Sequence, residues 1–97
     1  MATLPTLQSK LRALLPALVE RYHVASLALF GSVVRGQQTD GSDLDVLVTF
    51  SRTPGLLSFV ELENRLSDEL GMKVDLVMRD ALKPEIGQRI VREAVFV

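Results

Sequence analysis

The chain has 97 residues and a net charge of −1, so its length suits one domain and its charge offers no general attraction for nucleic acid. It contains no cysteine and a single histidine, which excludes disulfides, thiolate catalysis and a multi-histidine metal site within one chain. No apolar run approaches the ~20 residues that a membrane span needs. We expect residues 1–97 to form a single cytoplasmic domain, because the first residues also lack the pattern of a signal peptide.

Leucines at helical spacing open the chain and predict an amphipathic helix over residues 6–22. Pro16 lies inside this pattern and should kink the helix or split it in two. An apolar segment then predicts a strand over residues 25–30. A short helix should follow directly, from Ser32 to Arg35.

The middle of the chain alternates between loops, strands and a second long helix. Residues 36–42 are polar and contain two glycines, so we expect a loop, with Asp40 in a turn. Apolar runs predict strands over residues 44–50 and 73–78. Between them, leucines at helical spacing predict a helix over residues 56–70, which the following glycine ends.

Pro84 suits the first turn of a last helix, which would present Ile86, Ile90 and Ala94 on one face. The apolar end, residues 95–97, should either pack back on the core or pair with a strand. This order of elements predicts an α/β fold in which about four helices cover a small mixed sheet of three strands or more. The short loop between the first two strands favours their antiparallel pairing.

The most informative stretch joins these two strands, because it begins with Gly31-Ser32 and ends with Asp43-Leu44-Asp45. Alternate residues of a strand point to one face, so Asp43 and Asp45 should lie side by side. Two neighbouring carboxylates repel each other, and a cation between them relieves that repulsion. Glycine allows close approach of the backbone to a phosphate, the following helix offers free N–H donors, and Ser32 adds a hydroxyl.

A third carboxylate fits the same scheme, because Asp75 lies in the middle of the last predicted strand, between Val74 and Leu76. An acid in an apolar strand is unfavourable unless it is paired or binds a metal. Proteins hold Mg²⁺ beside substrate phosphates with carboxylates of this kind. We therefore predict a nucleoside triphosphate bound between the Gly-Ser turn and a carboxylate metal site.

Each of these residues also has a simpler interpretation. Asp43 could cap a helix or a turn, Ser32 could be an N-cap, and Asp75 could face solvent on an edge strand. Arg35 could either reach a phosphate or pair with an acid. The shared face of Asp43 and Asp45, together with the Gly-Ser turn that precedes them, favours a joint site over these separate roles.

The pattern resembles the DNA polymerase β-type nucleotidyltransferase superfamily and, more narrowly, the minimal nucleotidyltransferases that accompany HEPN-domain proteins in toxin–antitoxin pairs. The resemblance covers nearly the whole chain, and Val34 is only a conservative difference. The matching segments are Phe30-Gly31-Ser32, Arg35-Gly36, Ser42-Asp43-Leu44-Asp45, Val74-Asp75-Leu76-Val77 and Ile90-Val91-Arg92-Glu93-Ala94-Val95.

This resemblance implies a nucleotidyltransferase fold and the Mg²⁺-dependent transfer of AMP from ATP to a hydroxyl, with release of pyrophosphate. The implied catalytic and metal-binding residues are Asp43, Asp45 and Asp75, and the implied nucleotide-binding residues are Gly31, Ser32 and Arg35. Asp75 would also accept the proton of the attacking hydroxyl.

The implied partner is a HEPN-type ribonuclease toxin that receives AMP on a tyrosine, and we expect no direct contact with nucleic acid or membrane. Two alternatives stay open. The chain could neutralise a toxin by binding alone, or it could modify a small hydroxyl compound as antibiotic nucleotidyltransferases do. The second alternative would need a homo- or hetero-oligomer to complete the pocket. The intact carboxylates favour an enzyme over a binding module.

Overall fold

In the computed structural model, which describes residues 3–39 and 41–97, helices and strands alternate along the chain. The elements in order are α1 (Leu4–Tyr22), β1 (Val24–Phe30), α2 (Ser32–Arg35), β2 (Leu44–Phe50), α3 (Leu56–Leu70), β3 (Val74–Met78), the 3-10 turn η1 (Arg79–Ala81), α4 (Pro84–Glu93) and β4 (Val95–Phe96). Every predicted helix and strand is present. The predicted turn at Asp40 lies outside the described residues.

The strands form one mixed sheet in the order β3-β2-β1-β4. β1 runs antiparallel to both β2 and β4, which confirms the predicted pairing of the first two strands. β2 and β3 are parallel, so the chain must cross over between them, and α3 makes this crossover. The sheet has a fourth strand because the apolar end of the chain pairs with β1, where the Val97 N–H donates to the Leu27 carbonyl at 3.0 Å.

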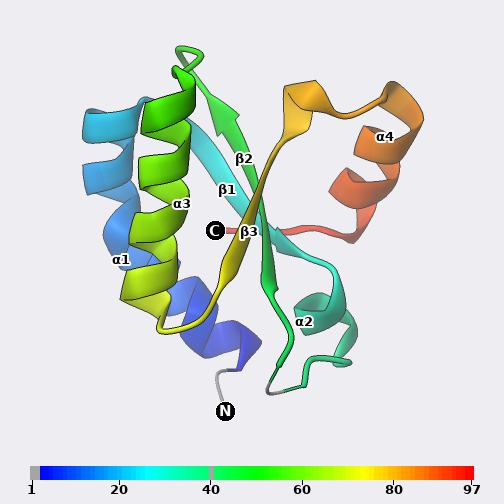
Figure 1. Ribbon diagram of the computed structural model, residues 1–97. Helices are drawn as coiled ribbons and strands as arrows, with labels where there is room; N and C mark the ends of the chain where they lie inside the picture. The colour runs from blue at the N-terminus through cyan, green and yellow to red at the C-terminus, as the bar shows by residue number, and fades with distance from the viewer. Residues whose placement is uncertain (1–2, 40) are drawn as a thin grey trace.

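The helices divide between the two faces of the sheet. Figure 1 shows α1 and α3 against one face, whereas α2 and α4 lie on the opposite side. Alternate residues of β2, Leu44, Val46 and Val48, are fully buried against α1 and α3 and form the centre of the core. The residues between them, which include Asp45, face the second side.

α1 is one helix through Pro16, so the predicted split at this residue is wrong. Proline has no N–H to donate to the carbonyl four residues earlier, but Leu11 and Leu18 on either side of it are fully buried. Burial of these leucines outweighs the missing hydrogen bond. The helix ends at His23, whose left-handed backbone and N–H bond to Val19 form the C-cap.

Of the helices in the described part of the chain, none combines the length and hydropathy needed to cross a lipid bilayer.

Candidate active site

Gly31 separates β1 from α2 in a backbone conformation that is nearly restricted to glycine, with φ 77° and ψ −148°. Its carbonyl accepts the N–H groups of Val34 and Arg35 at 3.1 and 3.2 Å, which starts α2. A Cβ atom on Gly31 would overlap the Oδ2 of Asp45. The turn and the carboxylate packed against it therefore both require a glycine.

Ser32 is half-buried and is the first residue of the single helical turn α2. Gly36, in a left-handed conformation, ends the turn by donating its N–H to the Ser32 carbonyl, which also accepts the Gln37 N–H at 2.9 Å. The first N–H groups of a helix have no partner within it. The hydroxyl and the N–H groups at the start of α2 are thus placed at the end of β1, beside Asp45.

Asp45 and Asp75 lie directly opposite each other on the neighbouring strands β2 and β3. The residues that flank them in both strands are buried in the core, so the two carboxylates point to the face that carries α2 and α4. Asp43 directly precedes β2, and its negative charge acts on Asp45. The structure therefore brings the three predicted carboxylates to one end of the sheet.

The surroundings of Asp45 raise the pKa of its carboxyl group. Burial raises the pKa of Asp45, and the negative charges of Asp75 and Asp43 raise it further, whereas the charge of Arg35 lowers it. Glu93 of α4 also raises this pKa. The ionised form of Asp45 is therefore disfavoured by its own neighbours, and a cation placed among these carboxylates would favour it.

The carboxylates are not gathered into a closed ligand set. Asp43 points its Oδ2 toward Lys73, at 3.8 Å from the Nζ atom, in a largely exposed pair of the kind that contributes little to stability. Among residues 3–39 and 41–97, no three acidic or imidazole side chains are close enough to hold one ion. Asp45 and Asp75 lie opposite each other in the sheet, whereas the Asp43 carboxylate is paired with Lys73.

Arg35 forms an ion pair with Glu93, at 2.7 Å between Nη1 and Oε1, and also donates from Nε to Gln37 at 3.2 Å. Of the two roles that the sequence allowed, the structure shows the pairing with an acid. The pair connects α2 with the end of α4, and both helices flank the carboxylates. The charge of Arg35 lowers the pKa of Asp45 and the charge of Glu93 raises it, so the two partners act on this carboxylate in opposite directions.

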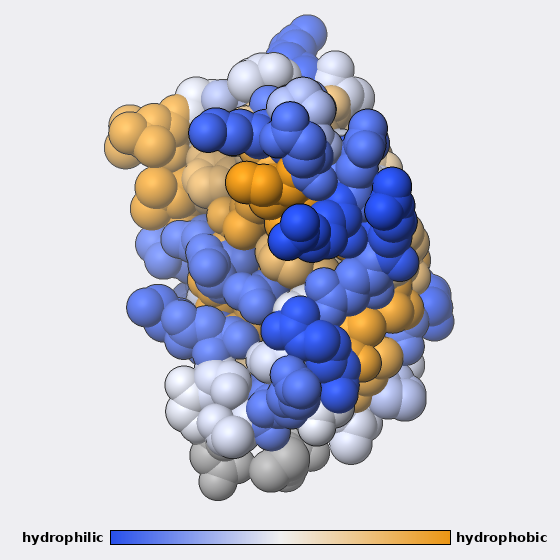
Figure 2. Space-filling view, turned by 90° about the vertical axis from the view of Figure 1, so that its right-hand side faces the viewer, coloured by the Kyte–Doolittle hydropathy of each residue, from blue (hydrophilic) through white to orange (hydrophobic). Residues whose placement is uncertain are grey.

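Figure 2 shows the face on which α2 and α4 lie. Hydrophilic residues cover much of this face, and hydrophobic residues appear between them, mainly in its upper part. The face that carries α2 and α4 is therefore largely polar.

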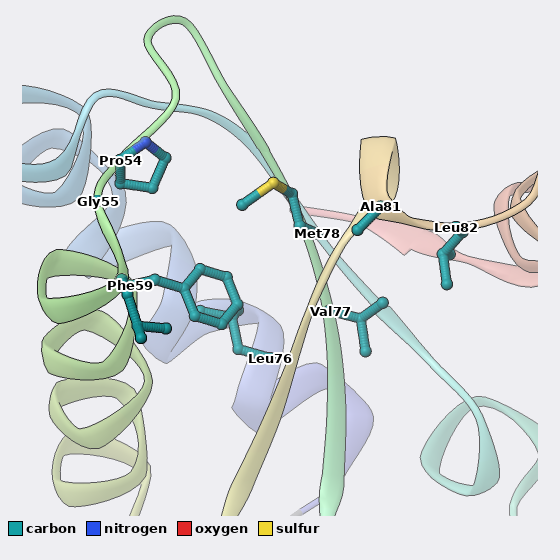
Figure 3. Close-up of a pocket in the computed structure, with 9 residues that line it drawn as sticks. Pro54, Gly55, Phe59, Leu76, Val77, Met78, Ala81 and Leu82 are labelled. Carbon is teal, nitrogen blue, oxygen red and sulfur yellow. The ribbon is translucent and has the colours of Figure 1, made fainter.

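An apolar cavity of about 480 Å³ lies beside β3, between the start of α3 and η1. In Figure 3, Phe59 and Leu76 point into one side of it, while Val77 and Leu82 lie on the other side of the strand. None of the six residues predicted for the site belongs to its lining. The cavity offers apolar contacts but no carboxylate for a metal.

Sequence reasoning missed Glu93, although it lies in one of the segments on which the resemblance rests. Its only signal was an acid next to Arg92 at the end of an amphipathic helix, a position that is usually solvated. The second role of Gly31, close packing against Asp45, was also missed, since the glycine was assigned to phosphate approach. Both contacts join residues that are distant in the sequence.

Comparison with known proteins places this geometry in a known group. A family model described as a nucleotidyltransferase domain matches residues 11–97. The protein adenylyltransferase MntA of Thermococcus cleftensis is 45% identical over 97 residues, which is 100% of this chain and 98% of that protein.

Two solved structures are similar in fold and sequence. A structure described as a "putative minimal nucleotidyltransferase" superposes with a TM-score of 0.82 at 36% identity, over 97% of this chain and 95% of the other. A toxin–antitoxin complex solved with AMP-PNP contains a chain that superposes with a TM-score of 0.77 at 27% identity, over 92% of this chain and 70% of that one.

Proposed function

Because the chain belongs to the nucleotidyltransferase domain family, and within it to the minimal nucleotidyltransferases related to MntA, we propose that it is a protein adenylyltransferase. It would transfer AMP from ATP to a hydroxyl of a partner protein. The observation that supports this most directly is the register of the sheet, which sets Asp45 opposite Asp75 and packs Gly31 against Asp45.

The three aspartates suit Mg²⁺ by their chemistry, since it prefers hard oxygen ligands and usually binds few carboxylates together with substrate phosphates. The raised pKa of Asp45, caused by burial and by Asp75 and Asp43, is the charge imbalance that a divalent cation offsets. When bound, Mg²⁺ would neutralise charge on the triphosphate and orient it. Asp43, just before β2, and Asp45 on β2 would be its ligands, together with Asp75 on β3.

The Gly31-Ser32 turn would bind the triphosphate. The N–H groups at the start of α2 and the Ser32 hydroxyl are donors, and they lie beside the carboxylates because Gly31 packs on Asp45. Phosphates held there would have their charge stabilised by donors on one side and by the metal site on the other.

Asp75 would act as the base, because it is exposed on an edge strand where an incoming hydroxyl can reach it. The hydroxyl oxygen bonds to the α-phosphorus, its proton passes to Asp75, and the bond to the bridging oxygen of pyrophosphate breaks. An exposed base on an open face accommodates a hydroxyl carried by a large molecule. This geometry favours a protein acceptor over a small compound, which an open surface grips poorly.

We infer that the acceptor protein is a HEPN-type toxin and that this chain is its antitoxin. The similar chain solved with AMP-PNP is part of a toxin–antitoxin complex, and MntA is named a protein adenylyltransferase. The resemblance on which the sequence motifs rest implies the same partner class. Modification of a toxin side chain would then neutralise it covalently.

Mass spectrometry of a HEPN-type toxin incubated with this chain tests the proposal. After incubation with the chain, ATP and Mg²⁺, we expect adducts of one or more AMP groups on the toxin. They should be absent when Asp43→Ala/Asp45→Ala replaces the wild type. A toxin that is neutralised without an adduct would show inhibition by binding alone, and AMP transfer to a small compound without the toxin would show the antibiotic-type activity.

A matched pair of variants separates the two roles of Arg35. We expect Arg35→Ala to raise the KM for ATP about tenfold, because the cationic side chain proposed to bind the phosphates is lost. Glu93→Gln frees the guanidinium without removing it, so its KM should stay equal to that of the wild type or fall. Steady-state kinetics with varied ATP measures both. If both variants raise KM equally, Arg35 acts by holding α2 to α4 rather than by contacting phosphate.

A further inference from the structure

β3 carries Asp75 at the free edge of the sheet, since β2 is its single neighbour in the strand order. An edge strand has one row of backbone N–H and carbonyl groups without a strand partner, so it is held more weakly than a central strand. Asp75 also faces the like charge of Asp45 across the β2–β3 pair, which pushes the edge strand outward. Something besides β2 must keep β3 in place for the two carboxylates to stay opposite each other.

Two side chains of α3 bond to the free edge on either side of Asp75. The Leu76 N–H donates to the Oε2 of Glu63 at 2.8 Å, and the Val74 N–H donates to the Oγ of Ser67 at 2.9 Å. Glu63 and Ser67 are four residues apart and lie on one side of the helix, where the Ser67 hydroxyl donates to the Glu63 carbonyl at 3.0 Å. The backbone of Asp75 is thus fixed at both of its neighbours.

The same contacts set the direction of the Asp75 side chain. Val74 and Leu76 are buried toward α3, and Figure 3 shows Leu76 beside Phe59 on that side. Since adjacent strand residues point to opposite faces, anchoring both neighbours to α3 turns Asp75 toward the α2 and α4 face. The bond to a carboxylate is the stronger of the two, because a charged acceptor shortens and strengthens it.

We propose that Glu63 and Ser67 are positioning residues, which hold β3 so that Asp75 stays opposite Asp45 at the metal site. This inference rests on the role given to Asp75 in the proposed function. Both residues would act through the backbone of β3 rather than on the substrate or the ion. Groups that orient metal ligands in this indirect way change metal affinity when they are removed, even though they make no bond to the metal.

The test is a Mn²⁺ titration followed by electron paramagnetic resonance, with the full chain and AMP-PNP present. We expect Glu63→Ala to weaken Mn²⁺ binding about tenfold, and Ser67→Ala to weaken it less. Glu63→Gln keeps an acceptor oxygen and should restore most of the affinity. The matched control is Glu69→Ala, which replaces an exposed acid of the same helix. This variant should bind Mn²⁺ as the wild type does.

Amide hydrogen exchange in the absence of metal gives a second readout, in which the Leu76 N–H should exchange faster in Glu63→Ala. A lower unfolding midpoint with unchanged Mn²⁺ affinity would overturn the proposal, because the contacts would then serve stability alone. Equal losses in Glu63→Ala and Glu69→Ala would also overturn it. If Glu63→Ala does not fold, the milder Ser67→Ala decides by the same comparison.

Failure of the positioning role can be distinguished from failure of the proposed function. AMP transfer to the toxin tests the function, whereas Mn²⁺ affinity tests the positioning. A chain that binds Mn²⁺ more weakly in Glu63→Ala but modifies no protein would support the positioning and refute the acceptor. Wild-type protein that binds no Mn²⁺ with AMP-PNP would overturn the positioning together with the metal site.

Discussion

Asp45→Asn should lower the rate of AMP transfer by about 1,000-fold while making the unliganded chain more stable. The rate falls because the amide removes a charge that would bind the metal beside the triphosphate. The stability rises because the same charge is unfavourable in the folded chain, where burial, Asp75 and Asp43 raise its pKa. The gain should be about 0.5–1 kcal/mol at neutral pH, as for like charges on neighbouring strands.

The sign of this effect predicts its pH dependence. A raised pKa means that the folded chain binds a proton on Asp45 more tightly than the unfolded chain does, so wild-type stability from this group falls as pH rises past 3.8 and through the folded pKa. Above the folded pKa the penalty is complete, and below the unfolded value it vanishes. The difference in unfolding free energy between Asp45→Asn and the wild type should therefore be largest at neutral pH.

Urea unfolding without divalent cations, at neutral pH and near pH 3, measures this difference. A variant that is less stable than the wild type at neutral pH would contradict the expectation, since it would mean that the carboxylate has a stabilising partner. Addition of Mg²⁺ and ATP should reverse the order, because the ligands bind and stabilise only the wild type.

Gly31→Ala should reduce stability and activity more than a methyl group added at any other position of this site. It forces a side chain into a backbone region that costs about 1–3 kcal/mol, and its Cβ would also overlap the carboxylate of Asp45. We expect a loss of about 3 kcal/mol of unfolding free energy and the loss of AMP transfer. Urea unfolding and the mass-spectrometric assay measure the two effects.

Gly36→Ala is the matched control, because Gly36 has a similar positive φ of 70° but no atom within 4 Å of an added Cβ. Its cost should be the left-handed strain alone, about 1 kcal/mol. In the double variant Gly31→Ala/Asp45→Ala the overlap disappears, so part of the lost stability should return. Equal costs for the two glycine variants would show that contact with Asp45 is unimportant.

The sequence predicted those features of the structure that depend on residues close together in the chain. The two-residue period of strands placed Asp43 and Asp45 on one face, and glycine chemistry located the turn at Gly31. The fold class and all the helices followed from the same local patterns. These predictions needed only the spacing of residues that are close together in the chain.

The rest depended on contacts between distant segments. The pairing of Asp45 with Asp75 requires the register that the α3 crossover sets, and the Arg35–Glu93 pair joins residues that are 58 positions apart. The continuity of α1 through Pro16 follows from packing of its leucines, which local propensity does not contain. The sequence left two possibilities for the apolar end, packing on the core or pairing with a strand. In the structure it forms β4 and pairs with β1.

The parallel pairing of β2 and β3 has a consequence for how the chain folds. Asp45 and Asp75 meet only after residues from both strands and the helix between them have docked, so no local fragment of the chain contains the site. Nucleotide and metal would therefore bind only the globally folded state, and their binding energy would add to the free energy of global unfolding. Amides throughout the sheet, and not only those near the aspartates, should then exchange more slowly when ligand is present.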